Sequence, residues 1–153
     1  MNVTLEPVTR NNVEAVMNIE LPPHQAQFVA SNAFSIAQAS FYPSLIPCAI
    51  YHDGKPAGFL LYGINANDEP GHYGIYRLMV APAQQGRGIG RRALAQLLDQ
   101  LRAQPDMRRI TICYKPDNEV GKRFYASLGF AEVGLDEDGE MIAEIRPAAP
   151  GSP

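Results

Sequence analysis

A glycine-rich turn that also carries arginines is the segment whose residue types most clearly indicate a chemistry. The turn reads Gln85-Gly86-Arg87-Gly88-Ile89-Gly90-Arg91-Arg92; it follows an apolar, strand-like segment and opens a helical pattern. Glycine permits positive φ and lets the backbone approach a ligand closely. Consecutive amides at a helix start, together with the helix dipole, favour an anion. The turn therefore predicts a binding site for a diphosphate, with the arginines adding positive charge.

Two common phosphate-binding patterns do not match this turn. A Walker loop needs Lys-Ser or Lys-Thr after its last glycine, whereas Arg91-Arg92 stands there. A dinucleotide fingerprint needs G-x-G-x-x-G near the first strand, whereas this chain has G-x-G-x-G in mid-sequence. The remaining alternative is a turn that only reverses the chain, but the agreement of strand, turn, arginines and helix favours a binding site.

A second segment, residues 118–130, combines a helix-capping asparagine with aromatic residues near the end of the same helix. With both segments present in this order, the chain resembles the GNAT superfamily of acyltransferases. The first motif of that family, Q/R-x-x-G-x-G/A, is matched by Gln85, Gly88 and Gly90. The second, an asparagine-headed helix ending in F-Y-x-x-x-G-F, is matched by Asn118, Phe124, Tyr125, Gly129 and Phe130, with Gly121 where the family more often has alanine.

The resemblance implies an acetyl-CoA-dependent N-acetyltransferase with an α/β fold, in which a splayed central mixed sheet carries helices on both faces. One domain is expected over residues 1–146 and a disordered tail over 147–153. The residues implied to hold acetyl-CoA are Met79, Val80, Gln85, Gly86, Arg87, Gly88, Ile89, Gly90, Arg91, Asn118, Gly121 and Tyr125.

Two of these residues are implied to act in catalysis. The Val80 amide would stabilise the oxyanion that forms when an amine attacks the thioester. Tyr125 would protonate the departing thiolate, because a tyrosine of pKa about 10 keeps its proton at neutral pH. The alternative for Tyr125 is a core aromatic packed beside Phe124 and Phe130.

The acceptor is expected to be a primary amine, which must lose a proton because its pKa lies near 10.4, the usual value of lysine. Many family members use a carboxylate on the strand before the glycine-rich turn, but residues 72–80 contain none. Glu20, His24 and His72, or a water chain that ends at one of them, remain candidates for the base. The N-terminal helices are similar to those of small bacterial polyamine or diamine acetyltransferases, which implies that Glu20, His24 and Phe28 line the acceptor site. Tyr76 is expected to line it too, although polyamine-like relatives tend to have an acidic residue at that place, directly before the arginine matched by Arg77.

The acidic segment 136–140 either attracts a cationic acceptor or forms a solvated hairpin tip. The leading hypothesis is acetylation of a small polyamine-like or diamine-like amine by direct attack in a ternary complex. A protein or peptide amine, an aminoglycoside, and a non-catalytic CoA-binding sensor are the alternatives. No metal site is expected.

The surrounding pattern predicts the elements that position these residues. A strand is expected at 3–8, helices at 11–20 and within 24–42, and a hairpin from Cys48 to Ile64 that turns at Asp53-Gly54. Strands at 73–80 and 110–114 are joined by a helix with an apolar stripe, so they should be parallel. The helix at 118–128 is followed by a last hairpin that turns at Asp138-Gly139.

Composition sets wider limits. The chain has 153 residues, 46% of them hydrophobic and 19% charged, which is typical of one globular domain. Its net charge of -3 argues against a nucleic-acid partner and suits a cationic substrate. Both cysteines, Cys48 and Cys113, are expected to be buried. The N-terminus lacks a signal-peptide pattern, so a cytoplasmic protein without a membrane partner is expected, and Phe41-Tyr42 is a candidate homodimer contact.

Overall fold

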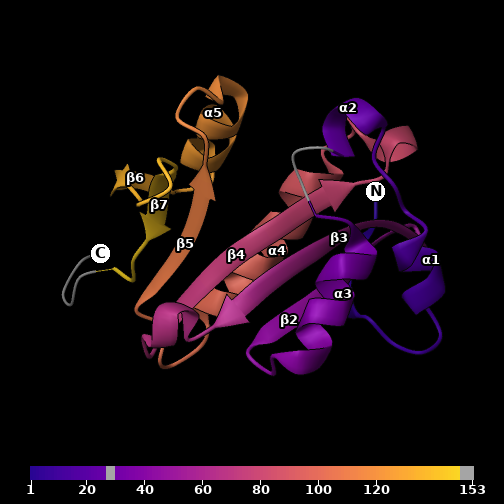
Figure 1. The fold of residues 1–153 in the computed structure, drawn as a ribbon, viewed down its shortest axis with the longest axis horizontal. Coiled ribbons are helices and arrows are strands. Elements are labelled where there is room, and N and C mark those ends of the chain that lie inside the picture. The colour runs from indigo at the N-terminus through magenta and orange to yellow at the C-terminus, as the bar shows by residue number, and fades with distance from the viewer. Residues whose placement is uncertain (27–29, 149–153) are drawn as a thin grey trace.

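The computed structural model describes residues 1–26 and 30–148, which form one seven-stranded sheet flanked by helices (Figure 1). The strands are β1 (Val3–Pro7), β2 (Leu45–His52), β3 (Lys55–Ile64), β4 (His72–Val80), β5 (Arg109–Tyr114), β6 (Ala131–Leu135) and β7 (Met141–Ile145). The helices are α1 (Val13–Met17), α2 (Pro23–Ala26), α3 (Asn32–Phe41), α4 (Ile89–Arg102) and α5 (Glu119–Ser127), with short 3₁₀ turns at Ala66–Asp68 and Pro82–Gln84. The predicted mixed α/β sheet is confirmed.

The sheet divides at its centre. Its strand order is β1-β2-β3-β4-β5-β7-β6, and β4 and β5 run parallel whereas the other neighbouring pairs are antiparallel. Pairing between β4 and β5 runs only from His72–Arg109 to Ile75–Ile112, although both strands continue beyond it. Figure 1 shows the strands parting after this short ladder. The gap therefore opens at the carboxyl ends of both strands.

A β-bulge lies on β4 where the gap begins. Arg77 pairs with Leu61 of β3, but Ile75 pairs with the next residue of β3, Tyr62, so Tyr76 is the additional residue. A bulge bends its strand and increases the local twist. It also directs two consecutive side chains, Tyr76 and Arg77, to the same face of the sheet.

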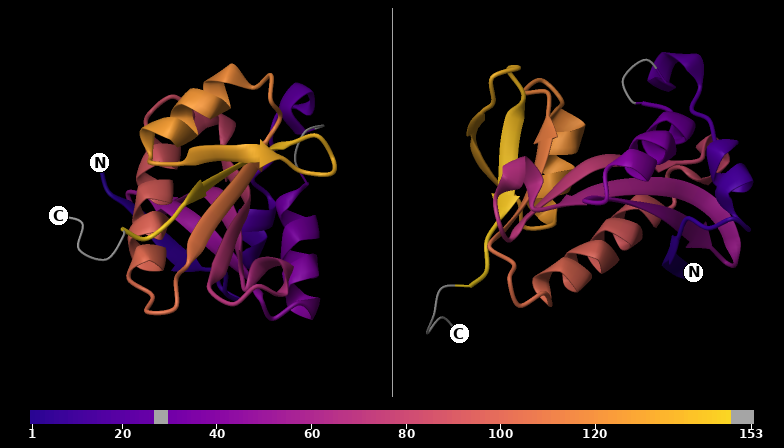
Figure 2. Two further views of the ribbon diagram at one scale, coloured as in Figure 1. Left: turned by 90° about the vertical axis from the view of Figure 1, so that its left-hand side faces the viewer. Right: turned by 60° about the horizontal axis from the view of Figure 1, so that its bottom comes forward.

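Helices cover both faces of the sheet, as predicted, and Figure 2 shows α3 and α4 on opposite sides of it. The apolar stripe predicted for α4 is confirmed, because every residue of it is at most 3% exposed. On the opposite face, Val16 of α1 packs with Phe59 and Leu61 of β3 in a smaller core. The residues of the α4 stripe are Ile89, Ala93, Leu94, Leu97, Leu98 and Leu101.

Two boundaries differ from the sequence prediction. Helix α1 ends at Met17, with Asn18 as its C-cap, so Glu20 lies in the following loop rather than on the helix. Strand β2 begins at Leu45 and includes Pro47, which the sequence placed before the strand. Pairing of β2 with β1 stops at Cys48, so Pro47 lies where that edge of β2 is open and its missing N–H disrupts no ladder bond there.

The last hairpin has a turn built by one carboxylate. Asp136 Oδ1 accepts hydrogen bonds from the backbone N–H groups of Asp138 and Glu140, both at 2.9 Å, and Gly139 closes the turn at φ 80°. The predicted turn is confirmed. Its consequence is that Glu140 lies directly before β7, beside the gap between β4 and β5.

Candidate active site

A cavity of about 500 Å³ occupies the gap between the separated strands. Residues of β4, β5, the start of α5 and the last hairpin line it together. They are Ile75, Tyr76, Arg77, Leu78, Ile112, Cys113, Tyr114, Lys115, Asp117, Asn118, Tyr125 and Glu140. The structure thus brings together three residues that the sequence singled out, namely Tyr76, Asn118 and Tyr125.

The cavity has walls on both faces of the sheet. Ile112 and Tyr114 belong to the core packed under α4 and α5, so Cys113 between them points to the other face. Cys113 pairs with Ile142 of β7. Glu140 precedes Ile142 by two residues and therefore lies on the same face as Ile142 and Cys113. The bulge places Tyr76 on that face too. One side of the cavity therefore carries Tyr125 and Asn118, and the other carries Tyr76, Cys113 and Glu140.

Tyr125 is held by three aromatic rings. It stacks on Tyr114 with ring centroids 5.5 Å apart and meets Phe124 and Phe130 edge-on at 5.2 and 6.0 Å. Burial, and secondarily the nearby Tyr114, raises the pKa of Tyr125 above its usual value of 10. No side chain among the described residues is recorded as a hydrogen-bond partner of its hydroxyl. A fixed, protonated phenol at a cavity wall can donate a proton.

Asn118 is the N-cap of α5, and its Oδ1 accepts a hydrogen bond of 2.9 Å from Gly121 N–H. A Cβ at Gly121 would lie 2.6 Å from the Asn118 Nδ2. Glycine at position 121 therefore makes room for the capping amide. The cap leaves the Asn118 NH₂ group as a donor at the cavity wall.

The backbone of Val80 faces the gap. Ala81 N–H donates to Ala57 O of β3 at 2.7 Å, and amides alternate in direction along a strand, so Val80 N–H points away from β3. Val80 O accepts a 3.0 Å hydrogen bond from Gln85 Nε2, which also reaches Gln25 on α2. Met79 pairs with Phe59 of β3, and its role as a cofactor contact stays a prediction.

The glycine-rich turn has the geometry of an anion site. Gly86 and Gly88 adopt φ 80° and 79°, and Gly88 is the N-cap of α4 without any side-chain cap. The first amides of α4 are therefore not occupied by a capping side chain. Arg87 and Arg91 are exposed beside them, and the Arg91 guanidinium lies 5.3 Å from the Phe124 ring centre.

The remaining predicted acceptor residues are distributed differently. Glu20 and Met79 line a second cavity of about 300 Å³ between α1, α3 and the end of β4. His24 is exposed on α2 and does not line either of these two cavities. Phe28 lies outside the described residues. Of the three predicted residues that the structure describes, Tyr76 alone lines the cavity in the gap.

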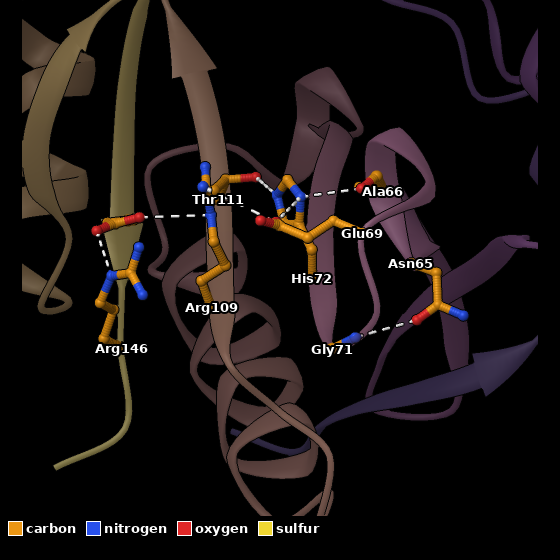
Figure 3. A network of polar contacts seen from close by, with 9 residues as sticks. Asn65, Ala66, Glu69, Gly71, His72, Arg109, Thr111 and Arg146 are labelled. Carbon is orange, nitrogen blue, oxygen red and sulfur yellow. Dashed lines mark hydrogen bonds and ion pairs between the residues drawn. The ribbon is translucent and has the colours of Figure 1, made fainter. Parts of the chain in front are cut away.

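His72, a candidate base, lies at the closed end of the β4–β5 pair. Figure 3 shows its buried ring bonded to Thr111 Oγ1 through Nε2 at 2.6 Å and to Ala66 O through Nδ1 at 3.0 Å. Glu69 lies 3.0 Å from the same Nδ1. Burial and then the nearby Arg109 lower the pKa of His72 below 6.5. His72 does not line the cavity, so this geometry gives it a structural role.

Sequence reasoning was wrong on one cavity residue and left another open. Cys113 is exposed to the cavity rather than buried, and Cys48 is half-buried. Burial, and then the carboxylates of Asp136 and Glu140, raise the pKa of the Cys113 thiol. For Glu140, the sequence alone does not distinguish a substrate contact from a solvated hairpin tip. The alternation of β7 with β5 would have indicated its face, but that register was not evident from the sequence.

Two features are absent from the part of the chain that the structure describes. No cluster of three or more His, Cys, Asp or Glu side chains suited to a metal ion occurs among the described residues. None of the helices in this part of the chain is both long and apolar enough to cross a bilayer.

The similarity of this chain to known proteins includes both the glycine-rich turn and the segment 118–130. Residues 13–130 match the model of the Acetyltransferase (GNAT) family. The chain is similar to the spermine/spermidine N(1)-acetyltransferase of Bacillus subtilis (strain 168), with 24% identity over 93% of this chain and 97% of that protein.

Solved structures share the fold at low identity. Aminoglycoside acetyltransferase AAC(6')-Ib in complex with coenzyme A superposes with a TM-score of 0.76 at 20% identity, over 95% of each chain. The ribosomal-protein-S18-alanine N-acetyltransferase from Escherichia coli superposes with a TM-score of 0.74 at 19% identity, over 98% of this chain and 97% of that one. At such identity these likenesses show the fold.

Proposed function

Because the chain belongs to the acetyltransferase (GNAT) family and is an acetyl-CoA-dependent N-acetyltransferase, we propose that its acceptor is a small, cationic primary amine of the polyamine or diamine kind. The observation that carries this proposal is the cavity in the sheet gap, with Tyr125 on one face and Glu140 on the other. Two substrates that enter from opposite faces can meet there without a covalent enzyme intermediate.

The glycine-rich turn fits the pyrophosphate of acetyl-CoA. A Cβ at Gly86 or Gly88 would meet nothing within 4 Å, so the space beside their backbone is open to a ligand. The uncapped first turn of α4 supplies N–H donors, and Arg87 and Arg91 supply positive charge. Gln85, Ile89 and Gly90 shape the same turn. In this proposal Asn118 donates to the pantetheine arm, and Met79 contributes through its backbone.

Two groups of the chain act on the reacting atoms in the proposed reaction. As the amine nitrogen bonds to the acetyl carbon, the carbonyl oxygen gains negative charge, and Val80 N–H stabilises it. The carbon–sulfur bond then breaks, and the Tyr125 hydroxyl gives its proton to the sulfur. Its raised pKa keeps that proton in place at neutral pH. The proton that the amine nitrogen loses as the amide forms passes through water to the Tyr125 phenolate and restores it.

The acceptor class rests on three observations. A relative that covers most of this chain is named for acetylating spermine or spermidine. The net charge of the chain is -3. Glu140 presents a carboxylate to the cavity on the face opposite Tyr125. Glu20, in the second cavity, and His24 and Phe28, on the neighbouring N-terminal segment, are proposed to line the outer part of the acceptor path.

We also propose a cytoplasmic homodimer. Phe41 and Tyr42, at the end of α3, are 83% and 57% exposed, which is unusual for large aromatic side chains. Both cysteines are free thiols, as a reducing compartment would keep them.

The test is a panel assay of CoA thiol release from acetyl-CoA. The panel holds spermidine, spermine, short diamines, amino acids, an aminoglycoside and a lysine peptide. Turnover with the polyamines or diamines, at kcat/KM at least about tenfold above that of the other amines, is the expected result. A preference for the peptide or the aminoglycoside would replace the acceptor class, and tight acetyl-CoA binding without any turnover would indicate a sensor.

A further inference from the structure

Tyr76 rests on two glycines that face each other across the β3–β4 ladder. Gly63 and Gly74 are register partners, and both lie on the sheet face that carries Tyr76. A Cβ at Gly63 would lie 2.6 Å from Cε2 and 3.2 Å from Oη of Tyr76, and one at Gly74 would lie 3.1 Å from both Cζ and Oη. The phenol end of the ring therefore occupies the space that two side chains would otherwise fill.

The packing of the Tyr76 ring on Gly63 and Gly74, which we call the glycine seat, determines how much of the cavity stays open. The ring is folded back along β4 onto the glycines, away from the open end of the gap, and yet Tyr76 is 45% exposed. The exposed part of the ring forms a wall of the cavity on the face opposite Tyr125. The three heavy atoms nearest to a Cβ at Gly63 all belong to the Tyr76 ring, so an alanine there would displace the ring first.

A carboxylate completes the same half of the cavity. Glu140 lines it from the start of β7, and no hydrogen bond or ion pair of its side chain is recorded among the described residues. Cys113 lines the same cavity. Burial and then the Cys113 thiol raise the pKa of Tyr76, and burial, then Asp136, then Glu140 raise the pKa of Cys113. An aromatic ring and a carboxylate across a small cavity suit an alkylammonium group.

Two cations also line the cavity. Arg77 turns back towards the chain, where its Nη1 approaches Tyr76 O at 3.4 Å. Lys115 lies at the carboxyl end of β5, beyond Tyr114. The cavity as a whole is therefore not strongly acidic, and recognition of a cation depends on the local pair of ring and carboxylate.

We propose that Tyr76, seated on Gly63 and Gly74, and Glu140 form the acceptor's ammonium-binding site, so that the glycine pair determines acceptor affinity without touching the acceptor. This inference rests on the proposed function, because it places the acceptor on the face opposite Tyr125. It adds a specificity-determining carboxylate and two positioning residues to that site.

Binding of spermidine to the protein saturated with CoA, followed by calorimetry, tests the site without requiring turnover. Glu140→Gln should weaken spermidine binding by about tenfold, the scale of a charge-assisted hydrogen bond. Glu137→Gln removes a charge from the same turn but not from the cavity, and should leave affinity unchanged. An equal loss of spermidine affinity in both variants would mean that Glu140 acts only by long-range electrostatic attraction, and it would overturn the assignment of Glu140 to the binding site.

The glycine seat is tested by a double-mutant cycle. Gly63→Ala should weaken spermidine binding by about threefold to tenfold, the scale of a cation–π contact, and leave CoA affinity unchanged. Gly134→Ala is the matched control, because a Cβ there meets nothing within 4 Å. In a Tyr76→Ala background, Gly63→Ala should have no further effect. An equal effect of Gly63→Ala with and without the ring would contradict the seat.

The outcome also separates this inference from the proposed reaction. Spermidine binding that depends on Glu140 and Tyr76, in a protein that turns over no amine, would retain the ammonium site and refute the acetyltransferase assignment to polyamines. If the protein acetylates polyamines and neither Glu140→Gln nor Gly63→Ala changes the kinetics, the proposed reaction stands and the ammonium-binding site is refuted.

Discussion

Asn118 has a structural task that can be separated from its proposed contact with the cofactor. Its Oδ1 caps α5 through Gly121 N–H, while its NH₂ group remains directed to the cavity wall. An asparagine N-cap contributes about 1 kcal/mol to helix stability. A change that moves the amide therefore affects both the cap and the cavity.

We expect Gly121→Ala to weaken acetyl-CoA binding while leaving the stability of the protein nearly unchanged. The new Cβ would come within 2.6 Å of the Asn118 Nδ2 and displace the amide, so acetyl-CoA affinity should fall several-fold. Alanine favours the helix by up to about 1 kcal/mol over glycine, which offsets the weakened cap. Urea unfolding should thus change little while the acetyl-CoA dissociation constant rises. The control is Val120→Ala, at an adjacent residue that is 81% exposed. Unchanged acetyl-CoA binding in Gly121→Ala would remove Asn118 from the cofactor site.

At the level of single elements, the start of α4 joins the proposed pyrophosphate site to the core. Gly88 adopts φ 79° directly before Ile89, which is only 1% exposed. A non-glycine residue at positive φ costs roughly 1 kcal/mol. Because the buried Ile89 side chain fixes the first residue of α4, strain at Gly88 should shift the amides at the start of α4 that face the ligand.

Gly88→Ala should therefore raise the KM for acetyl-CoA by about tenfold, which corresponds to about 1.4 kcal/mol. Gly54→Ala is the matched control, since Gly54 has φ 83°, an equally open surrounding and a place in the distant β2–β3 hairpin. Both variants should lose similar unfolding free energy, but only Gly88→Ala should lose acetyl-CoA affinity. Equal KM values for the two variants would argue against the turn as the pyrophosphate site.

Local patterns in the sequence predicted most elements well. The stripe of α4 and the turn at Asp53-Gly54 depend on periodicity and on φ preferences, which are local properties. The β-bulge at Tyr76 depends on how β3 and β4 pair, and the position of Glu140 depends on the register of β7 with β5. Those are non-local properties, so the sequence placed Tyr76 at the acceptor only by resemblance and left the role of Glu140 open.

For the whole molecule, the decisive feature is a sheet that is joined at one end and open at the other. The joined end holds the short β4–β5 ladder together with His72–Thr111 and an ion pair of 3.4 Å between Arg109 and Glu144 (Figure 3). This network connects β4, β5 and β7 on the face opposite α4. It maintains the junction while the strands separate above it.

The network should make stability depend on pH. Burial lowers the pKa of His72 in the folded state below its unfolded value of 6.5, so protonation favours the unfolded chain. The stabilisation is complete above pH 6.5 and is lost as the pH falls through the lowered folded value. Each unit of lowering corresponds to about 1.4 kcal/mol.

Urea unfolding between pH 7.5 and 5 measures this dependence. The parent protein should lose unfolding free energy as the pH falls below 6.5, whereas His72→Gln should be less stable at pH 7.5 and show a smaller slope. His24→Gln, at an exposed histidine of α2, is the control for the removal of an imidazole. A parent slope that survives in His72→Gln would assign the pH dependence to other groups.

The measurement that tests the central account most directly is the rate of CoA thiol release for Tyr125→Phe beside the parent protein. Both are saturated with acetyl-CoA and with the best amine of the panel, and acetyl-CoA affinity is measured separately. The ring and its three aromatic contacts remain in the variant, so acetyl-CoA should bind normally while kcat falls by about 10²-fold or more. An unchanged kcat would show that Tyr125 is only a wall of the cavity and that another group protonates the departing sulfur.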